Sequence, residues 1–212
     1  MKKRKQVLQM LLVVVLLASA GPLLGQMAGE KGEIDWQASL VSGWFSGATI
    51  LRGQTVGEEY QLKTDDGVLV GLRLSGEQEY FGGEITLAGV FQDLNLKKNP
   101  AAIMSSPSDS SMFLFSFNAL IFPAGNTLLE GRVRPFLTVG PGLAIIDTDF
   151  DKVSNETIFN MNVGTGVKFL LGDEGNPVLR FDWRWYYMVG STAGLENSMY
   201  HQELTVGLGI RF

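Results

Sequence analysis

After Gly21 the chain shows no long helical apolar period; instead, large apolar residues recur at every second position. The stretch from residue 179 to 187 is the clearest case. One set of alternate residues, which we call one parity, consists of Leu179, Phe181, Trp183, Trp185 and Tyr187. The other parity consists of Arg180, Asp182, Arg184 and Tyr186. Successive side chains of a β-strand point to opposite faces, so this spacing predicts a strand with one apolar face. Because the pattern returns many times, we predict an all-β fold.

Eight segments carry the alternation. They lie near residues 33–44, 66–76, 79–93, 111–122, 133–146, 157–171, 177–188 and 200–212. Three connections are short and polar (76–78, 123–132 and 172–176), and four are longer (45–65, 94–110, 147–156 and 189–199). Short turns on the periplasmic rim and long external loops are typical of an antiparallel up-and-down transmembrane β-barrel, whose apolar band of about 25 Å suits strands of about 11 residues tilted near 40°.

Alternation alone does not say which face points outward, because a soluble ligand-carrying barrel has the same period with the faces exchanged. The apolar face holds more bulk than a narrow lumen can accommodate, whereas the other face mixes glycine, small polar residues and isolated charges. Aromatic residues also gather near the strand ends, as in the girdles of membrane barrels. They are Trp36, Phe81, Phe169 and Phe212 toward one rim, and Trp44, Phe91, Phe113, Phe159, Trp185 and Tyr187 toward the other. We therefore predict a membrane barrel rather than a soluble one.

The start of the chain has the three-part layout of a secretory signal peptide. Basic residues at positions 2–5 precede an apolar run from Met10 to Ala18, and the small residues Ala18 and Ala20 frame a cleavage site. A membrane-anchoring helix is the alternative, but the run falls short of the roughly 20 residues that a span needs. We predict a signal peptide over 1–20, a short periplasmic lead over 21–32 and a barrel domain over 33–212.

Charge and cysteine content narrow the possible partners. Cleavage after residue 20 would leave 13 basic against 22 acidic residues, a formal net charge of −9. An acidic chain is not expected to bind nucleic acid. The chain has no cysteine, which excludes disulfides and thiolate metal sites.

Three segments together resemble the small OmpA-like and OmpW-like outer-membrane β-barrel families. They are residues 133–143 (VRPFLTVGPGL), 162–168 (NVGTGVK) and 180–185 (RFDWRW). The last strand resembles the terminal assembly signal of such barrels, here carried by Leu208, Ile210 and Phe212. The resemblance implies an export route, the barrel-assembly machinery, outer-membrane lipids and lipopolysaccharide as partners, and no particular external ligand. A peptidoglycan-binding domain like that of OmpA is not expected, because no segment follows Phe212 in this sequence.

Charged residues on the inward parity are the candidate functional residues. They are Arg73, Glu84, Arg134, Lys168, Arg180, Asp182, Arg184, Glu203 and Arg211. Charges in a narrow lumen must pair or reach water, so we predict ion pairs. They would form either a static plug or a gated polar conduit, and we favour the plug because eight strands leave room only for side chains. A structural or surface-binding protein is therefore predicted, with a narrow small-solute conduit as the alternative.

His201 raises a third possibility, a lipid A-modifying hydrolase, because Glu203 shares its face and Ser191 or Ser198 precedes it. In deacylases of the PagL type, however, a serine lies two residues after the histidine, where this chain has Glu203. We therefore expect no catalytic residues and place His201 at the rim as a polar interface residue.

No cofactor or metal site is expected. The inward Gly-x-Gly pairs at 140–142, 164–166 and 207–209 are not followed by helices, so they do not indicate a phosphate-binding loop. We expect them to ease curvature or make room for large neighbours, and a small cavity is the alternative. Asp147, Asp149 and Asp151 alternate as in a calcium loop but lack its glycine and its final glutamate.

Overall fold

The computed structural model describes residues 34–55, 58–99, 102–103, 108–148, 156–172, 176–192 and 195–212. The predicted signal peptide, its cleavage residues Ala18 and Ala20, and the whole of the lead predicted at 21–32 lie outside these ranges. Within the described part of the chain, no helix is long and apolar enough to cross a membrane.

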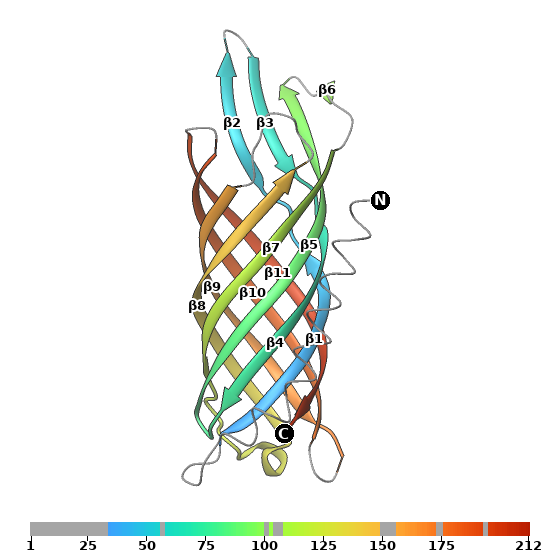
Figure 1. Cartoon of the computed structure of the whole chain (residues 1–212), viewed down its shortest axis with the longest axis vertical. Coiled ribbons are helices and arrows are strands. Elements are labelled where there is room, and N and C mark those ends of the chain that lie inside the picture. The colour runs from blue at the N-terminus through green and yellow to red at the C-terminus, as the bar shows by residue number, and fades with distance from the viewer. Residues whose placement is uncertain are drawn as a thin grey trace.

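Eight antiparallel strands form a closed barrel (Figure 1). In ring order they are β1 (Asp35–Phe45), β4 (Gly67–Glu77), β5 (Phe81–Asn99), β7 (Ser108–Ile121), β8 (Val133–Thr148), β9 (Glu156–Leu170), β10 (Pro177–Thr192) and β11 (Leu195–Arg211). Each strand pairs with the next, and the first pairs with the last. The predicted eight-stranded up-and-down barrel is confirmed.

The seam between β1 and β11 joins the two ends of the barrel domain. Leu40 lies opposite Leu208, and the ladder runs to Gln37 opposite Arg211. At its end the Trp36 amide donates to the Phe212 carbonyl at 3.3 Å, and the Phe212 amide donates to the Trp36 carbonyl at 2.9 Å. Closure removes the sheet edges, whose backbone groups could not be satisfied in hydrocarbon.

One rim of the barrel carries longer strands than the sequence predicted. The connection expected at 45–65 contains β2 (Thr49–Thr55) and β3 (Glu58–Thr64), which pair with each other, and β3 pairs with the end of β5. A two-residue strand, β6 (Ala102–Ile103), pairs with the same part of β5. Strands β10 and β11 likewise continue through most of 189–199, because a ladder already in register can extend into polar sequence. Part of each of these long connections is therefore strand, and β2, β3 and β5 rise above the wall in Figure 1.

The opposite rim holds both ends of the barrel domain and the shorter connections. The turn after β4 closes with a bond of 2.7 Å from the Gln78 amide to the Phe81 carbonyl, and the turn after β9 closes with a bond of 2.8 Å from Leu171 to Pro177. The connection between β7 and β8 contains the only described helical segment, the short 3-10 turn η1 (Leu128–Gly131). We call this the turn rim and the other the loop rim.

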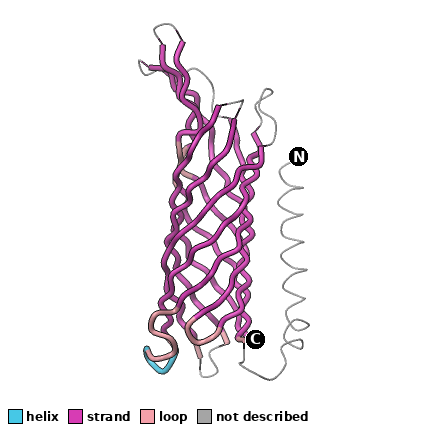
Figure 2. Tube along the Cα trace, turned by 90° about the vertical axis from the view of Figure 1, so that its left-hand side faces the viewer, coloured by secondary structure: helices cyan, strands magenta, loops and turns pink. Residues whose placement is uncertain are grey.

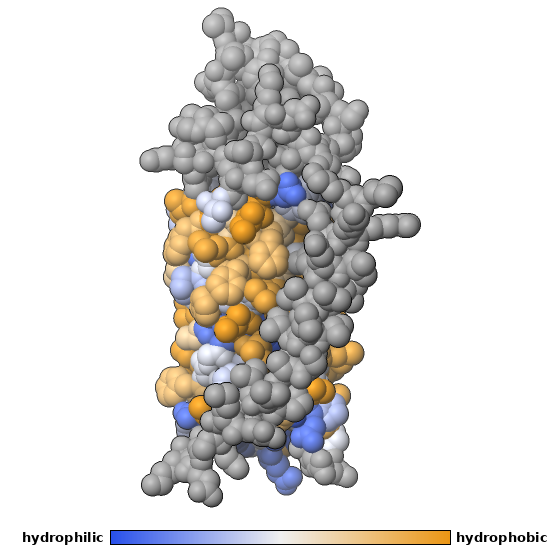
Figure 3. All heavy atoms as spheres, in the orientation of Figure 1, coloured by the Kyte–Doolittle hydropathy of each residue, from blue (hydrophilic) through white to orange (hydrophobic). Residues whose placement is uncertain are grey.

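The two faces of the wall differ in polarity. Large apolar residues on the outward face are exposed on all eight strands, among them Leu40, Val68, Phe81, Phe117, Leu143, Phe159, Trp183 and Leu208. Figure 3 shows such side chains covering much of the described wall. Inward residues are nearly all buried.

The lumen is filled by two kinds of side chain in succession. Along β10 the inward residues after Val178 are Arg180, Asp182 and Arg184, followed toward the loop rim by Tyr186 and Met188. The charged part is called the ionic zone. The part nearer the loop rim is called the apolar zone and contains Val41, Phe45, Leu69, Val90, Met112, Leu114, Ile158, Met188 and Met199, all buried. A small second apolar cluster of Leu120, Phe122 and Phe136 lies toward the turn rim.

Candidate functional site in the barrel lumen

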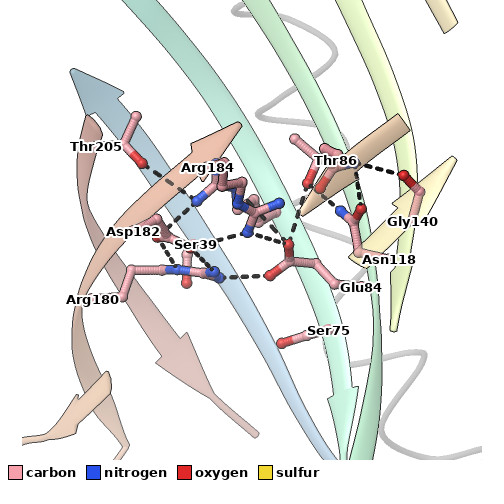
Figure 4. A network of polar contacts seen from close by, with 12 residues as sticks. Ser39, Ser75, Glu84, Thr86, Asn118, Gly140, Arg180, Asp182, Arg184 and Thr205 are labelled. Carbon is pink, nitrogen blue, oxygen red and sulfur yellow. Dashed lines mark hydrogen bonds and ion pairs between the residues drawn. The ribbon is translucent and has the colours of Figure 1, made fainter. Parts of the chain in front are cut away.

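The ionic zone is built from three arginines and three carboxylates on four strands. Strand β10 supplies Arg180, Asp182 and Arg184, because alternate residues of a strand share one face. Two strands across the lumen supply Arg73 on β4 and Glu84 on β5, and the neighbouring strand β11 supplies Glu203. Figure 4 shows Arg180 and Arg184 converging on Glu84.

Asp182 and Glu84 each bridge more than one arginine. Asp182 accepts from Arg180 Nη2 at 2.8 Å, from Arg184 Nη2 at 3.0 Å and from Arg73 Nη1 at 2.7 Å. Glu84 accepts from Arg180 Nη1 at 2.8 Å and from Arg184 Nη2 at 2.7 Å. The carboxylates therefore link the arginines into one network instead of separate pairs.

Glu203 joins this network to the apolar zone. It pairs with Arg73, accepts from Thr205 Oγ1 at 3.0 Å and accepts from the Tyr186 hydroxyl at 2.7 Å. The tyrosine ring in turn lies 5.7 Å from that of Phe45. The three positive and three negative charges balance, and the side chains of all six residues are 0% exposed. Balance is required, because burying a net charge in a dry interior costs several kcal/mol.

A second ion cluster lies nearer the turn rim, around Glu77 of β4. Glu77 pairs with Lys168 and accepts from Arg134 Nη1 at 3.1 Å. Lys168 also donates to Gln37 Oε1 at 3.1 Å, and Arg134 also donates to the Gln78 carbonyl at 2.9 Å. The Arg134 guanidinium lies 4.2 Å from the centre of the Phe122 ring, so the ion cluster rests on the small apolar cluster.

Inward glycines make room for these long side chains. A Cβ at Gly164 would lie 2.8 Å from Cγ of Arg184, and one at Gly207 would lie 2.9 Å from Cγ of Arg180. At Gly166 a Cβ would lie 2.4 Å from the ring of Phe136, which packs 5.3 Å from the Arg180 guanidinium. Of the roles expected for the inward glycines, the structure therefore supports clearance of space at Gly164, Gly166 and Gly207.

The structure places the predicted site residues as follows. Arg73, Glu84, Arg134, Lys168, Arg180, Asp182, Arg184 and Glu203 are buried in the two clusters. Arg211 does not join them; it lies at the turn rim, 27% exposed, with Asp35 Oδ2 at 3.5 Å from Nη1. The predicted assembly residues Leu208, Ile210 and Phe212 are exposed on the outer face. Glu77 was missed, because it was assigned to a turn, although it continues the inward parity of Arg73 and Ser75.

His201 is not a rim residue, so that expectation was wrong. It is buried inside the barrel, with Nδ1 2.8 Å from the Ser46 carbonyl and its ring stacked 4.9 Å from that of Phe45. His201 lies directly opposite Tyr186 in the pairing of β10 with β11, and opposite residues share a face, so both side chains point into the lumen. Ser198 lies on the outward face, and the side chain of Ser191 is outside the described residues. The arrangement therefore does not bring Ser198, His201 and Glu203 together for hydrolysis.

Among the described residues, no three histidine or carboxylate side chains are grouped to hold a metal ion. Asp149 and Asp151, two of the three alternating acids, lie outside the described ranges.

No family model and no curated protein matches this sequence. Among solved structures, Neisserial surface protein A superposes with a TM-score of 0.55 at 16% identity, covering 87% of this chain and 100% of that one. The outer membrane protein OprG from Pseudomonas aeruginosa gives 0.57 at 14% identity, covering 85% and 98%. The outer membrane protease OmpT from Escherichia coli gives 0.50 at 10% identity, covering 86% and 99%. The resemblance drawn from the sequence is thus confirmed in the fold: this chain has the fold of the small outer-membrane β-barrels.

Proposed function

We propose that the chain is an integral outer-membrane protein with a structural or surface-binding role, whose lumen is filled and does not conduct. One observation carries this proposal: a charge-balanced ionic zone and an apolar zone follow each other along the same lumen. A permeating ion would have to disrupt the ion pairs of the ionic zone and then enter the apolar zone without its hydration shell. Hydrophobic constrictions of this kind exclude ions by dewetting.

The outer face supports the membrane location. Apolar side chains are exposed on every barrel strand, as hydrocarbon requires and water does not favour. Delivery there would use the signal peptide at 1–20, cleaved after Ala20, and the terminal signal at Leu208, Ile210 and Phe212. Lipopolysaccharide, outer-membrane lipids and the barrel-assembly machinery would then be its partners.

The loop rim supports a surface-binding role. Strands β2 and β3 pair beyond the wall and are braced by the extended part of β5, so a small sheet stands above the barrel (Figure 1). Elements displayed on a rigid scaffold are the usual contact sites of such proteins. Under this proposal the external partner contacts this projecting sheet.

A narrow polar conduit is the second candidate, and one observation favours it. Side-chain polar atoms of Ser116, Thr138, Asn160 and Asn162 are buried without a hydrogen-bond partner among the described residues. They line three adjacent strands, where water could satisfy them.

Planar-bilayer recording of the refolded protein separates the two candidates. No sustained conductance is expected if the lumen is sealed. A steady conductance that changes in Arg184→Gln would overturn the proposal and support the conduit.

In parallel, lipid A incubated with the protein should keep its mass; loss of one acyl chain, abolished in His201→Ala, would establish the hydrolase.

The export and assembly part is tested separately. Mass spectrometry of the membrane fraction should find the mature N-terminus after Ala20. Deleting Phe212 should lower the yield of the heat-modifiable folded form far more than Ser106→Ala does. An intact Met1 in a soluble fraction, or equal yields, would contradict it.

A further inference from the structure

The turn between β7 and β8 exposes two neighbouring leucines at the turn rim. Leu128 is 43% exposed and Leu129 is 72% exposed, the largest exposure among the large hydrophobic residues that the structure describes. Both belong to η1, beyond the last paired residues of the wall. A leucine gains substantially from burial, so a water-facing turn is an unfavourable place for two of them.

The backbone at this turn is strained. Leu129 has φ 46° and ψ 49°, and Glu130 has φ 57° and ψ 35°. This left-handed region suits glycine and asparagine, and a branched side chain adopts it at a cost. Such strained residues persist where the surrounding structure fixes them, and in proteins they are concentrated at functional sites, where the strained geometry has a role.

Contacts on both sides of η1 brace the connection that carries it. Before η1, the Phe122 amide donates to the Tyr80 carbonyl of the neighbouring turn at 2.8 Å, and Thr127 Oγ1 donates to the Ala124 carbonyl at 2.6 Å. At Gly125 a Cβ would lie 2.8 Å from the Tyr80 ring, so the two turns pack closely. At the end of η1 the Arg132 amide donates to the Leu129 carbonyl at 3.1 Å.

The position of η1 points to what covers it. Figure 2 shows the segment at one side of the turn rim, beyond the ends of the strands. The end of the wall from which this connection leaves is apolar and exposed: Ile121 lies opposite Leu137 on one side and Phe81 on the other, and all three are exposed. The connection that carries η1 begins directly after Ile121.

We propose that Leu128 and Leu129 form a lipid anchor, which inserts into the interfacial layer of the leaflet at the turn rim. The proposal rests on the membrane location proposed above. A lipid surface, and not a protein, is the occupant because the leucines lie on the connection that leaves an exposed apolar wall, and that wall already requires lipid. Glu130 follows them and is exposed, so its charge can stay among the headgroups.

The absence of cysteine from the chain makes a direct test possible. Leu129→Cys, Asn126→Cys and Val206→Cys would each carry a nitroxide label in the full mature barrel, refolded into phosphatidylcholine–phosphatidylglycerol vesicles. Asn126 is the exposed polar control in the same connection, and Val206 is the control on the apolar wall. Collisions with oxygen should dominate at 129 and 206, whereas collisions with a water-soluble nickel chelate should dominate at 126.

Each other outcome has a definite meaning. If label 206 reports lipid and label 129 reports water, the anchor is wrong and the membrane barrel stands. If label 206 also reports water, the proposed membrane location fails first.

A second comparison separates anchoring from turn geometry. Asparagine tolerates the left-handed region, so Glu130→Asn should raise the urea midpoint of unfolding from vesicles, or leave it unchanged. Leu129→Asn relieves the same strain but removes the apolar side chain, and its midpoint should fall below that of the wild type. A midpoint for Leu129→Asn equal to or above wild type would overturn the anchor.

Discussion

The ionic zone and the apolar zone fill one barrel by opposite means. In the ionic zone, Arg73, Asp182 and Glu84 find their ion-pair partners only because strands distant in sequence hold the correct register. In the apolar zone, Leu114 and Met188 need only complementary shape. Directional bonds specify an arrangement sharply, whereas apolar packing tolerates adjustment. The ionic zone should therefore fail abruptly when one member is lost, and the apolar zone should fail gradually.

The largest effect is expected for Asp182→Ala. It leaves three arginines facing two carboxylates, and an uncompensated buried charge typically costs about 3–5 kcal/mol. Urea unfolding of the refolded barrel in vesicles, followed by tryptophan fluorescence, measures the loss. A loss no larger than that of a rim ion pair would show that the side chain does not face the lumen.

Leu114→Ala should be the next largest, because it opens a cavity in the apolar zone. Substitutions of this type cost about 2–5 kcal/mol, depending on how far the surroundings collapse. Met188→Leu, which roughly conserves volume, is the matched control and should cost less than about 1.5 kcal/mol. If the two variants unfold at the same urea concentration, the zone is not closely packed.

Tyr186→Phe tests the junction of the zones. The ring is kept but the hydroxyl that donates to Glu203 at 2.7 Å is lost. We expect a loss of about 1–3 kcal/mol, because a buried carboxylate oxygen loses its donor. In an Arg73→Met background the same substitution should cost a different amount, since both residues bind Glu203. Strict additivity would argue that they do not share this carboxylate.

Asp35→Ala should have the smallest effect. Its pair with Arg211 has the same chemistry as the ionic zone, but the two side chains are 43% and 27% exposed. Exposed pairs contribute about 0–1 kcal/mol, and added salt should reduce even this. A loss comparable to that of Asp182→Ala would remove burial as the explanation of the contrast.

The strands and their outward faces could be predicted from the sequence, because a period of two is a local property. The pairing inside the lumen could not. That Glu203 reaches Arg73, across 130 residues of sequence, depends on the closed order of the strands. Arg211 was assigned to the lumen on parity alone, but it lies so near the strand end that its side chain reaches the rim.

The apolar zone was missed for a different reason. Near the loop rim both faces of several strands are apolar, as in Val68-Leu69-Val70 and Met112-Phe113-Leu114. The prediction placed the apolar residues of these segments on the outward face and assigned no apolar residue, such as Leu69 or Met112, to the lumen. An unbroken apolar run indicates burial on both faces and was the available signal.

The bonds between Trp36 and Phe212 make the barrel a ring. In a closed ring every strand has two neighbours, so the barrel itself does not determine between which two strands the chain begins and ends. Joining the present ends and opening the chain between β10 and β11 would keep every strand beside the same neighbours. Phe212 would then still bond Trp36 but would no longer be terminal. Such a circular permutant would separate what Phe212 contributes as a member of the wall from what it contributes as the end of the chain.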